Sequence, residues 1–162
     1  MQSAVYPGSF DPITNGHLDI IQRASRVFDN VVVGVLHNPN KKPYFDIEER
    51  VEIIRKVVEP YGNVEVTSFE GLLVDFMRTK PDHVLVKGLR AFSDFEYEFQ
   101  MAMMNRKLDE SIETLFMMTG NRYSFVSSTL VKEIFLLDGN IEELVPPLVY
   151  ESLKNKKERS LI

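Results

Sequence analysis

Gly16 and His17 lie where a short apolar segment passes through a proline and glycine turn into a segment of helical period. The first backbone N–H groups of a helix have no partner within it, and with the positive end of the helix dipole they attract an anion. Gly16 would let a ligand approach the backbone closely, and His17 would add a directional donor near neutral pH. A lone histidine at a helix start is more often structural or solvated, so this pattern predicts a phosphate site only together with others.

Hydroxyl and cationic side chains follow three other predicted strands. Lys41 and Lys42 come after the second strand, Lys87 ends the fourth, Arg90 lies just beyond it, and the Ser-Ser-Thr triplet 127–129 opens the helix after the fifth. Hydroxyls and amides at that helix start can hold another phosphate, and the cations can neutralise charge that develops during phosphoryl transfer. Each segment alone is explained as well by a solvated loop or a helix cap. Together they predict a site for phosphorylated substrates.

Five short β-branched or apolar runs alternate with segments of helical period, at residues 4–6, 31–36, 64–68, 84–87 and 114–118. Strands that are apolar on both faces are typical of a parallel sheet covered by helices on each side. We therefore expect an α/β fold: a single-domain, doubly wound (Rossmann-like) five-stranded parallel sheet with helices on both faces, spanning residues 1–162. Ligands of such sheets bind outside the carboxyl ends of the strands, where the strand order reverses, which would bring these loops together.

Helix ends can also be recognised in the sequence. Asp46 with Glu49 three residues later forms a capping-box pattern, and Gly139 is typical of a residue that ends a helix. Pro146 and Pro147 break the chain before a last helix that runs toward Lys156, in a C-terminal helical segment expected at about 141–157.

The chain has 162 residues, a formal net charge of −5 and no cysteine. The acidic balance argues against generic electrostatic binding to nucleic acid, and no apolar run is long enough to cross a bilayer. The absence of cysteine excludes disulfides, thiolate metal sites and a cysteine nucleophile. The first residues lack the basic and apolar segments of a signal peptide. We expect a cytoplasmic protein with no nucleic-acid or membrane partner.

The familiar phosphate loops are missing, because no pair of glycines has the spacing of G-x-x-x-x-G-K-[ST] or G-x-G-x-x-G. This disfavours a P-loop kinase and a standard NAD enzyme. Residues 94–98 contain three carboxylates that could ligate Mg²⁺, but a solvated polar helix face opposite Phe95, Phe99 and Met103 explains the pattern more simply. The methionines at 101, 103, 104, 117 and 118 are expected in the core or in the lining of a pocket.

Five stretches, in order along nearly the whole chain, resemble the bacterial phosphopantetheine adenylyltransferases. They are YPGSFDPITNGH, FEGLLVDF, KGLRAFSDFEYE, MAMMNRKL and YSFVSSTLVKE. That family belongs to the nucleotidylyltransferases, whose hallmarks are a T/H-x-G-H motif and an I-S-S-S/T-x-x-R/K motif. Here residues 14–17 and 126–132 match those two motifs. The GLRAFSDFEYE block is the more specific of the resemblances.

The resemblance implies a reaction: transfer of the adenylyl group of ATP to 4′-phosphopantetheine by direct in-line displacement. The products would be dephospho-coenzyme A and pyrophosphate, in the penultimate step of coenzyme A biosynthesis. The resemblance further implies a requirement for Mg²⁺, held mainly through the ATP phosphates rather than by protein ligands, assembly as a homohexamer, and coenzyme A as a feedback ligand.

The resemblance also implies roles for individual residues. His17 would stabilise the pentavalent α-phosphoryl transition state, and Lys41 would act with it as a second catalytic residue. The residues implied to contact 4′-phosphopantetheine are Ser9, Lys41, Leu73, Lys87 and Asn105. The residues implied to surround ATP are Ser9, Phe10, His17, Gly88, Leu89, Arg90, Glu98, Tyr123, Ser124, Phe125, Val126, Ser127, Ser128 and Thr129.

Lys87 departs from the family pattern, which usually has arginine at this position. Lysine keeps the positive charge but lacks the bidentate fork that suits a phosphate, so an altered acceptor affinity is expected. Val126 in place of isoleucine and Thr129 in place of serine are milder departures. Residues 119–122 form a less familiar loop, which makes the ATP contacts just before Tyr123 less defined.

Two alternatives stay open at the level of sequence. One is a nucleotidylyltransferase of the same fold that acts on nicotinamide mononucleotide or glycerol phosphate. The residues that argue against it, by suggesting an extended, partly apolar acceptor, are Leu72, Leu73, Met104 and Asn105. The other is a non-catalytic module that binds a nucleotide or coenzyme A, which has no need of a transition-state donor such as His17.

Overall fold

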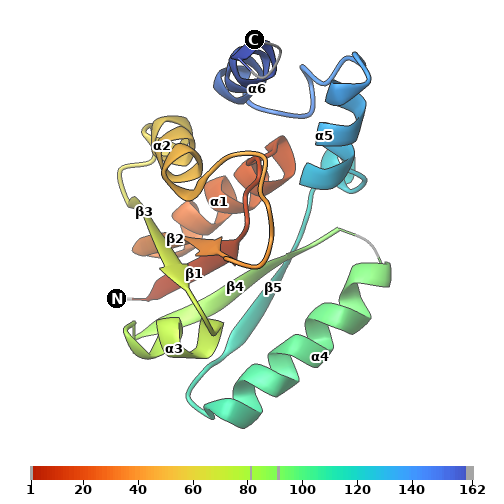
Figure 1. Ribbon diagram of the computed structural model, residues 1–162. Helices are drawn as coiled ribbons and strands as arrows, with labels where there is room; N and C mark the ends of the chain where they lie inside the picture. The colour runs from red at the N-terminus through yellow and green to blue at the C-terminus, as the bar shows by residue number, and fades with distance from the viewer. Residues whose placement is uncertain (1, 81, 91, 160–162) are drawn as a thin grey trace.

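The fold is a five-stranded parallel sheet with helices on both faces (Figure 1). A computed structural model describes residues 2–80, 82–90 and 92–159, and of residues 92–94 the backbone alone. The strands are β1 (Ser3–Gly8), β2 (Asn30–His37), β3 (Val64–Glu70), β4 (His83–Leu89) and β5 (Thr114–Met118). Their order in the sheet is β3-β2-β1-β4-β5. The predicted doubly wound α/β fold is confirmed.

Helices α1 and α2 cover one face of the sheet, and α3 lies on the other face with α4 (Figure 1). Strand residues alternate between the two layers: Ala4 and Tyr6 pack with Ile20 of α1, whereas Val5 packs with Val74 of α3. The helices are α1 (Asn15–Val27), α2 (Ile47–Val58), α3 (Leu73–Arg78), α4 (Phe92–Leu108), the short 3₁₀ helix η1 (Asn121–Tyr123), α5 (Ser128–Leu136) and α6 (Pro147–Arg159).

The predicted helix ends are observed with two differences. The capping box of α2 forms as expected, because Asp46 accepts from the N–H of Glu49 and the Glu49 side chain accepts from that of Asp46. At the end of α5, however, Asp138 and not Gly139 has the left-handed backbone, with φ 61°. Gly139 is needed for space instead, because an added Cβ would lie 2.4 Å from Cγ2 of Ile134. The last helix begins at Pro147, which confirms the break predicted at the two prolines, whereas residues 141–146 of the expected helical segment contain turns.

Helix α4 contradicts the expectation of an amphipathic helix with a buried apolar face. Phe95, Phe99, Met103 and Met104 are exposed, the two methionines at 56% each. The physical reason is that apolar residues are spread around this helix rather than gathered on one stripe, so the sheet cannot cover them all. The expectation that the methionines lie in the core or a pocket is therefore wrong for positions 103 and 104, and also for Met118 of β5, which is exposed as well.

Strands β1 and β4 separate toward their carboxyl ends. Their pairing runs only from Ser3↔His83 to Val5↔Leu85. By contrast, β1 stays paired with β2 as far as Gly8, and β4 stays paired with β5 as far as Leu89. This is the point where the strand order reverses, so the separation opens the edge of the sheet at the place where ligands of this fold class bind.

None of the helices in the described ranges combines the length and the apolar character that a membrane crossing requires.

Candidate active site

A cleft of about 640 Å³ opens between the carboxyl ends of β1 and β4. Its walls are the start of α1, the start of α5 and one side of α4. Of the residues singled out from the sequence, those that line the cleft are Ser9, Phe10, His17, Leu73, Lys87, Gly88, Arg90, Glu98, Asn105, Val126, Ser127, Ser128 and Thr129. Loops that lie far apart in the sequence therefore meet at one site.

The other predicted site residues lie outside the lining of this cleft. Lys41 is exposed on the loop between β2 and α2. Leu89 is buried at the end of β4, and Phe125 is exposed. Tyr123 lies behind the start of α1, where a Cβ added to Gly16 would be 3.5 Å from the Cβ of Tyr123. Ser124, the remaining residue of this set, closes η1 by donating its hydroxyl to the carbonyl of Asn121.

Part of the α4 wall was not predicted from the sequence. Tyr97 and Ala102 line the cleft beside Glu98, Asn105 and Met101, and only the last three had been singled out, Met101 as a core or pocket residue. Steps of three or four residues connect these positions, from 97 to 101 to 105 and from 98 to 102 to 105, so they share one face of the helix. Following the helical period from Glu98 to Asn105 would have found them. Other lining residues on strands and loops were also not predicted as site residues, because nothing in the sequence marks them. They are Tyr6, Leu36, Phe69, Leu85, Thr114 and Thr119.

Thr14 and His17 form the N-terminal cap of α1 and fix the imidazole ring. The Thr14 hydroxyl accepts from the N–H of His17 (3.4 Å), and the Thr14 N–H donates to Nδ1 of His17 (3.0 Å). Histidine thus takes the place that glutamate or glutamine holds in the usual capping box. Because Nδ1 accepts a hydrogen bond from the backbone, the proton of the neutral ring resides on Nε2.

His17 is held in its neutral form. Burial, with a smaller contribution from the positive charges of Arg90 and Lys87, lowers the pKa of His17 to about 4. At neutral pH the ring is therefore uncharged and offers the Nε2–H as a hydrogen-bond donor to a ligand in the cleft.

The turn between β1 and α1 is set by aromatic packing. Phe10 has a left-handed backbone with φ 47°, which is uncommon for a residue with a side chain. Its ring stands edge to face against Tyr6 (5.5 Å between centroids) and against His17 (5.1 Å). A Cβ at Gly8 would lie 3.0 Å from Cζ of Phe10, so glycine allows this close approach.

Two cations in the cleft contact protein acceptors. Lys87 Nζ lies 3.3 Å from Oε2 of Glu98, which joins the end of β4 to α4. Arg90 Nη1 donates to the carbonyl of Val126 at 3.0 Å, which joins β4 to the segment before α5. An anionic ligand could accept from either cation and compete with these contacts. Ser127 caps α5 by accepting from the N–H of Leu130 (3.1 Å), so the helix-cap explanation of this serine holds whatever else it binds.

Residues 5–134 match the family model described as cytidylyltransferase-like. Curated relatives cover 96% of the chain over 156 aligned residues and are named phosphopantetheine adenylyltransferase. Identity is 61% to that of Clostridium tetani (98% of the relative covered), 60% to that of Clostridium novyi (97%) and 54% to that of Alkaliphilus metalliredigens (99%).

The fold also resembles a solved structure, that of "a Putative Nicotinate-nucleotide Adenylyltransferase from Vibrio parahaemolyticus". The TM-score is 0.72 at 20% identity, with 96% of this chain and 93% of that chain covered. At this level of identity the similarity concerns the fold alone.

The His17 imidazole should titrate with a midpoint near 4 when NMR follows its ring resonances in the free protein, against about 6.5 for an unperturbed histidine. Because the unfolded chain binds more protons between these two values, the contribution of His17 to stability is present above pH 6.5 and declines as pH falls toward 4. Spectra of His17→Gln would assign the signal. A midpoint at or above 6.5, or a neutral ring protonated on Nδ1, would contradict the geometry described.

Proposed function

The chain belongs to the phosphopantetheine adenylyltransferase family, and from this premise we propose that the cleft between β1 and β4 aligns ATP with 4′-phosphopantetheine for direct adenylyl transfer. The reaction gives dephospho-coenzyme A and pyrophosphate and belongs to coenzyme A biosynthesis. The single observation that carries the proposed mechanism is the hydrogen bond from the Thr14 N–H to Nδ1 of His17, at a helix start that lines the cleft.

The transfer needs no nucleophile from the protein. A phosphate oxygen of 4′-phosphopantetheine forms a new bond to the α-phosphorus of ATP, and the bond from that phosphorus to the bridging oxygen of pyrophosphate breaks. Catalysis then consists of alignment and of stabilising charge on the α-phosphoryl oxygens. The Nε2–H of His17 is suited to donate to one of those oxygens, because the ring is neutral and its other nitrogen is already occupied.

The cations and helix starts suit the remaining phosphates. Lys87 and Arg90 extend from the end of β4 into the cleft, and the start of α5 with Ser127 lies across from them. We assign Lys87 and the exposed Lys41 to the acceptor phosphate, and Arg90 with the triplet 127–129 to ATP. Leu89 and residues 123–125 lie outside the cleft lining. We therefore assign them to positioning the residues that contact the nucleotide.

We propose that Mg²⁺ enters with ATP, coordinated mainly by its phosphates. The charges of the cleft support this, because Glu98 is the one carboxylate among the described lining residues and it already pairs with Lys87. The phosphates of ATP are therefore the better ligands for the cation. When bound, Mg²⁺ would neutralise the charge of the leaving pyrophosphate. Within the described part of the chain, no three His, Asp or Glu side chains lie together as a metal site would require.

Part of the cleft lining suits the pantetheine arm. Phe69, Leu72, Leu73 and Met101 provide apolar surface, and the buried Asn105 provides an amide. An extended, partly apolar acceptor matches this lining better than a second nucleotide does, and the names of the curated relatives agree with it. We assign dephospho-coenzyme A, and coenzyme A as a feedback ligand, to the same cleft because both carry this arm.

We propose that the chain assembles with copies of itself as a homohexamer in the cytoplasm. Exposed apolar side chains on α4 and on the edge strand β5 support self-association, because a surface of this kind is rarely left uncovered in a monomer. They include Phe95, Tyr97, Phe99, Met103, Met104, Leu108, Leu115 and Met118. The cysteine-free composition agrees with a reducing compartment.

Purified protein incubated with MgATP and 4′-phosphopantetheine should release pyrophosphate and form dephospho-coenzyme A in equal amounts. Nicotinamide mononucleotide as a parallel acceptor should give no dinucleotide, and EDTA in excess over Mg²⁺ should stop the reaction. Turnover with nicotinamide mononucleotide alone would point to a different acceptor, whereas ATP binding without pyrophosphate release would point to a non-catalytic module.

His17→Ala should lower kcat by about 10²–10³, the usual effect of removing one positioned donor to a transition-state oxyanion. The KM values for ATP and 4′-phosphopantetheine should change far less, because the donor acts mainly on charge that develops during transfer. Steady-state kinetics on folded protein, checked by thermal unfolding, would measure both. Near-normal kcat in the folded variant would rule out the role assigned to His17.

A further inference from the structure

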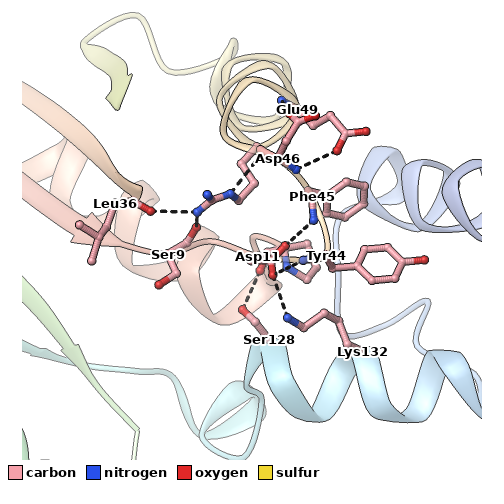
Figure 2. A network of polar contacts seen from close by, with 11 residues as sticks. Ser9, Asp11, Leu36, Tyr44, Phe45, Asp46, Glu49, Ser128 and Lys132 are labelled. Carbon is pink, nitrogen blue, oxygen red and sulfur yellow. Dashed lines mark hydrogen bonds and ion pairs between the residues drawn. The ribbon is translucent and has the colours of Figure 1, made fainter. Parts of the chain in front are cut away.

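Asp11 follows two cleft residues, Ser9 and Phe10, but it is not among the described residues that line the cleft. Its side chain is nevertheless buried, at 8% exposure, and both of its carboxylate oxygens accept hydrogen bonds (Figure 2). Oδ1 accepts from the N–H of Phe45 at 2.8 Å. Oδ2 accepts from the N–H of Tyr44 at 2.8 Å and from Nζ of Lys132 at 2.9 Å.

These partners belong to three different segments around the cleft. Asp11 is on the turn between β1 and α1. Tyr44 and Phe45 are at the end of the loop between β2 and α2, which also carries Lys41. Lys132 lies on α5, whose first residues line the cleft. One buried carboxylate therefore joins the turn that precedes His17, the Lys41 loop and the α5 helix start.

Neighbouring contacts fix the same turn on either side of Asp11. Arg50 of α2, which is 3% exposed, donates from Nη1 to the carbonyls of Ser9 (2.7 Å) and Leu36 (3.0 Å). The hydroxyl of Ser128 donates to the carbonyl of Pro12 at 2.7 Å. The backbone of the turn is thus held by these groups, while the Asp11 side chain holds the Lys41 loop.

We propose that Asp11 is a positioning residue for adenylyl transfer: its carboxylate fixes the Lys41 loop relative to the turn before His17. The proposal rests on the roles proposed above for Lys41 and His17. Lys41 is exposed, and its N–H donates to the carbonyl of Asn38 within its own loop. The bonds from Tyr44 and Phe45 to Asp11 are therefore the contacts that connect this loop to the turn before His17. With the loop anchored, the Lys41 ammonium can meet the acceptor phosphate without a large loss of chain entropy.

Asp11→Asn changes the chemistry of these contacts but not the size of the side chain. An amide offers one oxygen acceptor and an NH₂ donor, so its NH₂ would face either a backbone N–H or the ammonium of Lys132. The NH₂ group and the donor that it faces would repel each other in this buried place. The charge-assisted hydrogen bond between the Asp11 carboxylate and Lys132 would be lost as well. The loop should then be released on the side that faces Asp11.

A double-mutant cycle between Asp11 and Lys41 tests the proposal. We would measure kcat and both KM values for the wild type, Lys41→Ala, Asp11→Asn and the double variant. Lys41→Ala should raise the KM for 4′-phosphopantetheine about tenfold or more, and Asp11→Asn should raise it by a similar factor while the KM for ATP changes less than about threefold. In the Asp11→Asn background, Lys41→Ala should add less than about threefold, because its contact is already lost.

Asp109→Asn is the matched control. Asp109 also accepts from a backbone N–H, that of Ser111 (3.1 Å), and from a cation, Nε of Arg78 (3.1 Å). It lies between α4 and the first residue of β5, away from the carboxyl edge of the sheet that holds the cleft. It should lower the thermal unfolding temperature as Asp11→Asn does and leave the kinetic constants unchanged.

The outcomes separate the two proposals. If Lys41→Ala raises KM in the wild type and by the full factor again in Asp11→Asn, Asp11 is merely structural and the positioning proposal is overturned. If Lys41→Ala has no effect in the wild type, the Lys41 assignment fails and the positioning role fails with it. If Asp11→Asn does not fold, Lys132→Met replaces it, because that variant keeps the bonds from Asp11 to the backbone of Tyr44 and Phe45. The same cycle with Lys41→Ala should then show a smaller coupling of the same sign. Full additivity of the two substitutions would overturn the proposal.

Discussion

The hydrogen bond from the Thr14 N–H to Nδ1 of His17 is the constraint on which the site depends. It caps α1, and it also determines which ring nitrogen carries the proton. A glutamate at this position could cap the helix equally well, but it would place a negative charge where phosphates must bind. Histidine allows the same local structure while presenting a neutral donor, so helix formation and site chemistry are met by one residue.

The rest of the fold brings the substrates to that donor. Strands β1 and β4 part beyond Val5 and Leu85, and the space between their ends receives Lys87 and Arg90 from one side and the start of α1 from the other. The positive ends of α1 and α5 meet the same cleft, which favours anions from several directions. An enzyme that joins two phosphorylated molecules directly needs this kind of alignment more than it needs a reactive side chain.

Much of the fold could be predicted because local rules decide it. The five strands were identified by their apolar runs, and the α2 capping box by Asp46 and Glu49, because burial and hydrogen bonding act over a few residues. The meeting of the loops at one edge followed from the parallel arrangement. The cleft face of α4 was only partly predicted. Glu98 and Asn105 are polar signals and Met101 was expected in the core or in a pocket, whereas Tyr97 and Ala102 carry no comparable signal.

What could not be predicted depends on contacts distant in sequence. Nothing near Asp11 indicates that it would bind the amides of Tyr44 and Phe45 or the ammonium of Lys132, because these partners lie more than thirty residues away. The apolar residues of α4 were expected to be buried within the chain, but they are exposed. The sequence of one chain does not indicate whether such residues pack within that chain or against another one. At the end of α5, glycine was expected to end the helix, but the sequence did not show that Asp138 takes the left-handed backbone or that Gly139 is needed for space beside Ile134.

The most direct measurement is the stereochemistry of transfer at the α-phosphorus. ATP carrying sulfur in place of one non-bridging α-oxygen, as a single diastereomer, would be converted with 4′-phosphopantetheine, and the configuration of the product would be determined. Direct in-line displacement inverts the configuration once, so we expect inversion. Retention would require two displacements through an adenylyl group attached to the protein, and it would contradict the claim that alignment and a neutral His17 donor suffice.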